Sequence, residues 1–151
     1  MITSKDTMSE SRITNEMSVQ FPSDSANEAF ARVVVSAFVT QTNPTFEEVA
    51  DIKTAVSEAV TNSIIHGYEK QKGTIEIRVR LENKDVYIEI EDHGVGIADV
   101  QKAMEPLYTT KSNEERSGMG FSFMEAFMDE LVVESVLGSG TIVKMHKVIG
   151  R

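Results

Sequence analysis

Three short polar stretches in this chain carry residue types that a nucleotide site needs. They are Glu58–Asn62 (EAVTN), Asp92–Gly96 (DHGVG) and Gly118–Gly120 (GMG). The first offers a proton acceptor and an oxygen ligand for a metal, the second an acid that could read a base, and the third glycines that let phosphates come close. None of them is specific alone, but in this order and spacing they predict one nucleotide pocket.

Glu58 and Asn62 are four residues apart in a stretch with helical periodicity, so both side chains project from the same face of a helix. An Asn amide oxygen suits Mg²⁺, and a neighbouring Glu can orient and deprotonate a hydroxyl group. A solvated helix face would explain the same pair without any chemistry. We expect the pair to lie away from the stripe that faces the sheet, which comprises Val49, Ile52, Val56, Val60 and Ser63.

Asp92 comes directly after a run with strand periodicity and is followed closely by Gly94 and Gly96. An acid at the end of a strand can accept a hydrogen bond from an exocyclic amine such as that of adenine. The two glycines would let the backbone approach a flat base without a Cβ in the way. Turn chemistry alone is the competing interpretation of this stretch.

A long loop, residues 105–117, leads into Gly118 and Gly120 and shows no periodicity. A loop of this length inside a compact domain is more often functional than idle. Backbone N–H groups at the helix start that follows would form an anion site. Arg116 adds a cation that could close on a triphosphate, whereas Lys111 is more typical of surface charge.

The elements that must position these residues alternate between twofold and helical periodicity, which predicts an α/β fold with helices covering one face of a mainly antiparallel, mixed sheet. Thr45 and Glu48 form a capping-box signature that should open a long helix. The apolar stripe expected in the helix before it is Ala29, Phe30, Val33, Val34, Ala37 and Phe38. The expected strands are residues 17–21, 75–81, 86–90, 131–136 and 141–148, and the expected helices are residues 27–40, 45–66, 98–103 and 121–129.

Composition limits the classes of function. The chain has 151 residues, 40% of them hydrophobic, which is enough for one domain with a proper core. We expect residues 1–14 to be a disordered leader or extension and residues 15–151 to form a single domain. A formal net charge of −9 argues against direct nucleic-acid binding. The absence of cysteine excludes disulfides and thiolate chemistry, and the absence of a long apolar run predicts a cytoplasmic protein with no membrane partner.

The three stretches, in this order, resemble the N, G1 and G2 boxes of the ATP-binding fold shared by histidine kinases, gyrase-type topoisomerases, Hsp90 and mismatch-repair ATPases. Closer still, Ser57–Tyr68, Pro106–Lys111 and Glu115–Phe121 are similar to segments of the anti-sigma F factors, a family of serine protein kinases of spore-forming bacteria. Asn27–Val33 and Phe123–Asp129 add to this likeness, which covers nearly everything from residue 15 to 147. The resemblance implies a Bergerat-type ATP-binding fold.

The resemblance also implies roles for individual residues. Glu58 corresponds to the catalytic base, Asn62 to the Mg²⁺ ligand and a nucleotide contact, and Asp92 to the acid that reads adenine. Gly94 and Gly96 correspond to the glycines beside the base.

The remaining matched positions belong to a nucleotide lid and to a docking surface. Arg32, on the first helix, matches a position that the family uses to dock its sigma factor and its antagonist. His93 departs from the acidic residue expected at its position, although its side chain should point away from the base. The lid and its phosphate-contacting end comprise Thr110, Arg116, Ser117, Gly118, Met119 and Gly120.

The function implied by the resemblance is a regulator with two activities. The implied cofactors are ATP or ADP and Mg²⁺. With bound ATP·Mg²⁺ the protein would bind and inhibit a sporulation sigma factor. As a serine/threonine protein kinase, it would also phosphorylate a serine on an anti-anti-sigma antagonist protein. A homodimer is implied too, and the first strand and helix support it because they carry more apolar surface than one small sheet needs.

Two alternatives stay open. One is an ATP-dependent anti-sigma binding module with negligible kinase activity, against which the intact Glu58 argues. The other is the detached ATPase domain of a histidine kinase, which is disfavoured because no helix with a phosphoacceptor His precedes the domain.

Overall fold

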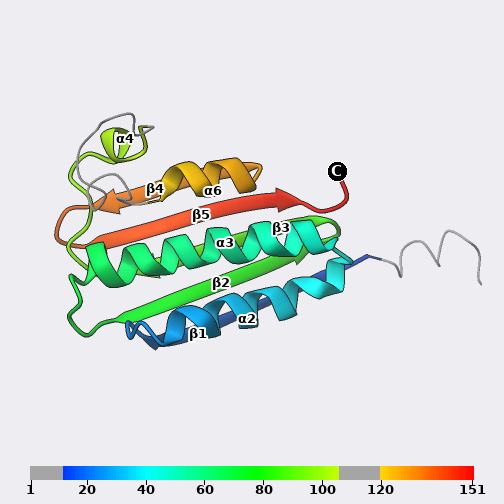
Figure 1. The fold of residues 1–151 in the computed structure, drawn as a ribbon, viewed down its shortest axis with the longest axis horizontal. Coiled ribbons are helices and arrows are strands. Elements are labelled where there is room, and N and C mark those ends of the chain that lie inside the picture. Colours follow the sequence, from blue (N-terminus) through cyan, green and yellow to red (C-terminus); the bar gives the residue numbers. More distant parts are fainter. Residues whose placement is uncertain (1–11, 106–119) are drawn as a thin grey trace, which may run out of the picture.

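One five-stranded sheet organises the chain. The computed structural model describes residues 12–105 and 120–151. The strands are β1 (Thr14–Pro22), β2 (Thr74–Glu82), β3 (Asp85–Asp92), β4 (Glu130–Val136) and β5 (Gly140–Val148), and they lie in the order β1-β2-β3-β5-β4. Every pairing in the described part of the chain is antiparallel, so the sheet is more uniform than the mixed sheet expected. The predicted α/β architecture is confirmed (Figure 1).

Three helices cover one face of this sheet. They are α2 (Asn27–Val39), α3 (Phe46–Asn62) and α6 (Phe121–Phe127), and Figure 1 shows them side by side in front of the strands. Shorter helical segments are η1 (Thr40–Thr42), η2 (Ser63–Gly67) and α4 (Val100–Ala103). Each predicted helix and strand is present, with ends that differ by a few residues from the expected bounds. No helix of the described residues combines the length and hydrophobicity needed to cross a membrane.

The alternating pattern of β2 and β3 divides the two faces of the sheet. Ile77 and Ile88 are fully buried under the helices, whereas the intervening side chains point to the open face. On that open face Arg78 forms ion pairs of 2.9 to 3.0 Å with Glu76, Glu89 and Glu91 on β2 and β3. A ladder of paired charges therefore keeps this side of the sheet compatible with water.

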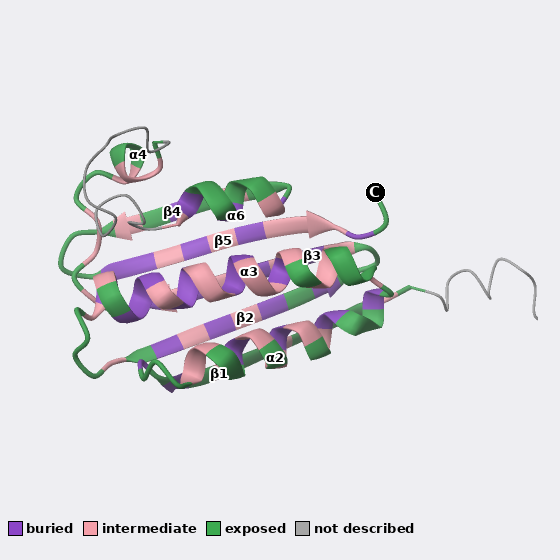
Figure 2. Cartoon of the chain, in the orientation of Figure 1, coloured by how far each residue is buried: buried purple, intermediate pink, exposed green. Residues whose placement is uncertain are grey.

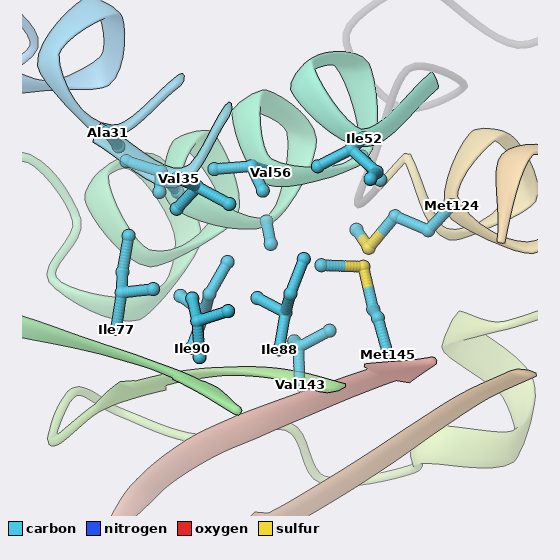
Figure 3. Packing of buried hydrophobic residues seen from close by; sticks show 14 of the residues in the cluster. Ala31, Val35, Ile52, Val56, Ile77, Ile88, Ile90, Met124, Val143 and Met145 are labelled. Carbon is cyan, nitrogen blue, oxygen red and sulfur yellow. The ribbon is translucent and has the colours of Figure 1, made fainter. Parts of the chain in front are cut away.

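Helix α3 lies at the centre of the helical layer. Its start is the predicted capping box: the Thr45 hydroxyl accepts the Glu48 amide at 3.1 Å, and the Glu48 carboxylate accepts the Thr45 amide at 2.9 Å. Its apolar side, which includes Ile52 and Val56, packs onto β3 and β5 (Figure 3). This packing fixes where the helix ends, and the polar residues of interest lie at that end.

The stripe expected for α2 is only partly correct, because two of its residues, Val34 and Phe38, pack against the buried core. The fully buried residues are Ala31, Val35 and Val39, whereas Phe30 is 45% exposed and Val33 is 61% exposed. Both sets recur at helical spacing, so periodicity alone could not choose between two apolar faces of one helix. Packing against α3 and the sheet determines which face is buried. The second apolar face, which carries Phe30 and Val33, remains uncovered in the described structure (Figure 2).

Candidate nucleotide site

Two of the three polar stretches meet at one end of the sheet, beside the start of α6. A small hollow there is lined by Asn62 at the end of α3, by Asp92 at the end of β3, by Gly96 in the loop that follows, and by Phe121 on the first turn of α6. These residues come from parts of the chain far apart in sequence. The convergence that the spacing predicted for Glu58–Asn62 and Asp92–Gly96 is therefore present in the fold.

Asp92 is the buried acid of this hollow. It is 4% exposed, and both of its carboxylate oxygens are engaged. The Ser63 hydroxyl donates to Oδ2 at 2.8 Å, and the Gly94 amide donates to Oδ1 at 2.9 Å. Each carboxylate oxygen can accept a further bond. The side chain is thus oriented from two sides while keeping capacity for a ligand's amine.

The end of α3 packs directly against the loop after Asp92. The helix widens into the π-turn η2, and the carbonyl of Gly67 accepts the Val95 amide at 2.8 Å. A Cβ added at Gly94 would lie 2.1 Å from the Gly67 carbonyl oxygen, and one added at Gly67 would lie 2.9 Å from Oδ2 of Asp92. Gly94, which is expected to lie beside a base, is therefore also required for contact between two backbone segments.

Several residues that line the hollow were not predicted as site residues, among them Ser63, Gly67 and Thr141. Ser63 was assigned to the core-facing stripe of α3, Gly67 only to the helix end, and Thr141 only to a strand. Thr141 is buried and pairs with Asp92 across β3 and β5. Its hydroxyl lies 2.8 Å from that of Ser135. The signal that could have found Thr141 is a buried hydroxyl on the strand that pairs with Asp92.

Glu58 and Asn62 were both expected to lie away from the buried side of α3, and this is correct for Glu58 but not for Asn62. Glu58 is half-buried, away from the fully buried side of α3, as predicted. Asn62 is only 8% exposed, because the last turn of α3 is enclosed by the loop after β3 and by α6. A buried amide at this position is consistent with a ligand role more than with a solvated helix face.

Glu58 occupies an unusual electrostatic position. Burial raises the pKa of its carboxyl group above the usual range, and the negative charge of Glu28 raises it further. Gly120, at the start of α6 with φ of +64°, lies so close that a Cβ there would be 2.2 Å from Oε1 of Glu58. The carboxylate is therefore partly desolvated and adjacent to the expected phosphate-binding end of the lid.

Arg32, the expected docking residue, belongs to a polar seam between α2 and α3, which we define as Glu28, Arg32, Ser57 and Thr61. Arg32 Nη1 donates to Glu28 Oε1 at 2.9 Å and to the Ser57 hydroxyl at 3.1 Å. Glu28 Oε2 accepts the Thr61 hydroxyl at 2.5 Å. The seam therefore includes the direct sequence neighbours of the two site residues on α3: Ser57 precedes Glu58, and Thr61 precedes Asn62.

The lid itself is outside the described residues, except for its last residue. This applies to Thr110, Arg116, Ser117, Gly118 and Met119.

A divalent cation would have few protein ligands here. The described residues contain no group of three or more His, Cys, Asp or Glu side chains that could hold a metal. Asn62 offers an amide oxygen, a hard donor suited to Mg²⁺. The donor set therefore fits an ion that arrives with phosphate oxygens and keeps its waters, and it does not fit a preformed protein cage.

A family model matches most of the chain: that of the histidine kinase-like ATPase domain corresponds to residues 21–147. Three similar relatives are named anti-sigma F factor. The one from Thermoanaerobacter sp. strain X514 is 58% identical over 137 residues, covering 91% of this chain and 96% of the relative. The one from Caldanaerobacter subterraneus subsp. tengcongensis is 59% identical with the same coverage. The one from Clostridium botulinum strain Eklund 17B is 59% identical over 134 residues, covering 88% and 94%.

Two solved structures share the fold at low sequence identity. The RsbU and RsbW domains of a Mycobacterium tuberculosis protein align with a TM-score of 0.64 and 19% identity, covering 89% of this chain and 32% of that longer chain. The catalytic domain of the histidine kinase ThkA aligns with a TM-score of 0.52 and 16% identity, covering 88% and 96%. At these identities the likeness shows the fold alone.

The contact between Gly67 and Gly94 generates a prediction about stability. Gly94→Ala should lower the free energy of unfolding by about 2 kcal/mol or more, because a methyl group 2.1 Å from the Gly67 carbonyl forces two backbone segments apart. Urea denaturation measures the change. Val95→Ala, a truncation of the exposed neighbouring residue, should change it by less than about 0.5 kcal/mol. Equal stability of Gly94→Ala and the wild type would contradict the contact.

Proposed function

The chain belongs to the anti-sigma F factors, within the histidine kinase-like ATPase domain family, and from this premise we propose that it is an ATP-dependent regulator of a sporulation sigma factor. With ATP·Mg²⁺ bound it sequesters the sigma factor. It also transfers the γ-phosphoryl group to a serine of an anti-anti-sigma antagonist, which releases the sigma factor. A role in binding a sigma factor and the ability to bind ATP or ADP follow from the family, whereas serine specificity, Mg²⁺ and the antagonist belong to the proposal.

The observation that carries the proposal is the meeting of Glu58, Asn62 and Asp92 at one end of the sheet. Asp92 is buried, and Ser63 and Gly94 orient its carboxylate, which supports a role in accepting the amine of adenine. Asn62 lies between this acid and the turn of α3 that carries Glu58. A nucleotide with its base at Asp92 would extend its phosphates past Asn62 toward Glu58 and the start of α6.

In the proposed reaction the serine oxygen of the antagonist attacks the γ-phosphorus. The bond between this phosphorus and the β–γ bridging oxygen breaks, ADP leaves, and the serine proton passes to the carboxylate of Glu58. Asn62 would contribute its amide oxygen to Mg²⁺, which supplies charge neutralisation across the phosphates. Arg116 and the amides of the lid are assigned to the developing charge on the γ-phosphoryl group.

The alternative is an anti-sigma module that binds ATP without transferring phosphate. The environment of Glu58 favours the kinase. A general base works best when its pKa lies near the working pH, and both burial and Glu28 raise the pKa of Glu58 in that direction. A binding module has no need of a partly desolvated carboxylate at this position.

Glu58→Gln tests the catalytic assignment. The variant should bind ATP as the wild type does but transfer phosphate to the antagonist at least about 100-fold more slowly, because the amide cannot accept the serine proton. The measurement uses labelled ATP, with acid treatment of the product to separate stable phosphoserine from labile phosphohistidine. Glu47→Gln, the same change at an exposed position of α3, is the matched control. If Glu58→Gln transfers phosphate at the wild-type rate, Glu58 is not the catalytic base. If the wild type puts no label on serine, the alternative of a binding module without kinase activity is favoured.

Glu28 should contribute to the pH dependence of transfer, as the second cause after burial of the raised pKa of Glu58. Although burial opposes it, hydrogen bonds from Thr61, Ser57 and Arg32 lower the pKa of Glu28 and keep it charged. Transfer should rise as pH increases through the raised pKa of Glu58, since the base must be deprotonated. Glu28→Gln removes one cause of the raised pKa of Glu58. The acid limb of the kcat profile should therefore move to lower pH. Glu47→Gln should leave the limb in place, and an unmoved limb in Glu28→Gln would refute the coupling.

A homodimer is the remaining part of the proposal. The uncovered face of α2 carries apolar residues that solvent would reach in a monomer, namely Ala29, Phe30, Val33 and Ala37. The adjacent strand β1 ends the sheet, so its outer edge has no partner strand in the described structure. An apolar helix face beside an unpaired strand edge favours association with a second copy over exposure.

Val33→Asp tests this interface. If α2 and β1 form it, a charge at this 61% exposed position should raise the dimer dissociation constant at least about tenfold, because the carboxylate would be desolvated without a partner. Sedimentation velocity at micromolar concentration measures the shift. Val132→Asp, at a 49% exposed position on β4, should leave association unchanged. A monomeric wild type, or equal effects of the two variants, would reject the proposed interface.

A further inference from the structure

Tyr68 joins three segments of the nucleotide site through one hydroxyl group. It directly follows the π-turn η2, and its hydroxyl donates to the carbonyl of Thr74 at 2.6 Å. The same oxygen accepts the amide of His93 at 2.7 Å. The phenol therefore connects the end of the α3 region, the start of β2 and the residue that follows the base-reading acid.

The ring of Tyr68 is held in place independently of these bonds. Its amide donates to the carbonyl of Ser63 at 2.8 Å, which closes the wide turn. A Cβ added at Gly73 would lie 2.3 Å from Cε1 of the ring, so this glycine leaves space for the ring to lie against the backbone. The position of the hydroxyl is thus set by packing, and the hydroxyl can in turn position other groups.

The group that it positions is the peptide between Asp92 and His93. The amide side of this peptide is held by Tyr68, as described above. On the carbonyl side, Gly140 approaches so closely that a Cβ there would lie 2.1 Å from the Asp92 carbonyl oxygen. The peptide therefore lies between a hydrogen bond on one side and a close backbone contact on the other. The carboxylate of Asp92 starts from this fixed peptide, and Ser63 and Gly94 orient its two oxygens.

We propose that Tyr68 is a positioning residue for base recognition: its hydroxyl fixes the Asp92–His93 peptide so that the carboxylate presents its free acceptor capacity to the 6-amino group of adenine. Tyr68 does not touch the base. It acts through Asp92, and this inference rests on the proposed role of Asp92. Loss of the hydroxyl leaves the ring packed but allows the peptide to rotate, because water can satisfy the exposed His93 amide.

Tyr68→Phe separates positioning from simple stability. The measurement is the dissociation constant of the full-length protein for ATP and for purine riboside triphosphate, which lacks the 6-amino group. For ATP the constant should rise about fivefold to tenfold, the loss expected for a misplaced hydrogen bond, and for the analogue less than about twofold. Discrimination between the two nucleotides should therefore fall. A merely structural role would weaken both nucleotides equally, and that result overturns the proposal.

Two further measurements make the test decisive. Tyr87→Phe, on the open face of the sheet, should leave both dissociation constants unchanged. Amide hydrogen exchange reports directly on the bond: the His93 amide should exchange faster in Tyr68→Phe than in the wild type, and unchanged protection refutes the proposal even if nucleotide binding is lost. If the wild type does not discriminate between the nucleotides, the base-reading role of Asp92 fails. If it does and Tyr68→Phe discriminates equally well, only the role of Tyr68 fails.

Discussion

The site depends on one backbone contact, that between the end of α3 and the loop after β3. The Gly67 carbonyl accepts the Val95 amide, and Gly94 lies so near the same carbonyl that no side chain fits between them. This contact brings Asn62, on the last turn of α3, to the same hollow as Asp92. The π-turn η2 makes it possible, because a wider turn redirects the chain without ending the helix abruptly, and such turns are common at functional sites.

The sequence was sufficient to predict the helices and strands, because these depend largely on local chemistry. The alternation of β2 and β3 and the capping box of Thr45 and Glu48 need no long-range information. The buried face of α2 could not be predicted. Its residues offer two apolar faces at helical spacing, and only packing against α3 selects Val35 over Val33. The burial of Asn62 depends likewise on segments that are distant in sequence.

Residues whose hydrogen-bond partners are distant in sequence were the hardest to predict. Ser63 directly follows Asn62 and Tyr68 lies one turn of η2 further on, but their partners, Asp92 and the His93 amide, are 25 to 29 residues away in sequence. Nothing in the local pattern distinguishes such a Tyr from one that fills space. The same holds for Gly73, whose missing side chain leaves room for the Tyr68 ring. The roles of these residues can be recognised only in the folded structure, in which the end of α3 lies next to the end of β3.

The polar seam between α2 and α3 links docking with catalysis in the proposed function. Arg32 is tied to Glu28 and Ser57, and Glu28 is tied to Thr61 and raises the pKa of Glu58. A partner that draws Arg32 toward its own carboxylate would leave Glu28 less neutralised and hence more effective in raising that pKa. In the proposed function, docking and proton acceptance would therefore share one electrostatic network, because Arg32 pairs with Glu28 and Glu28 raises the pKa of Glu58.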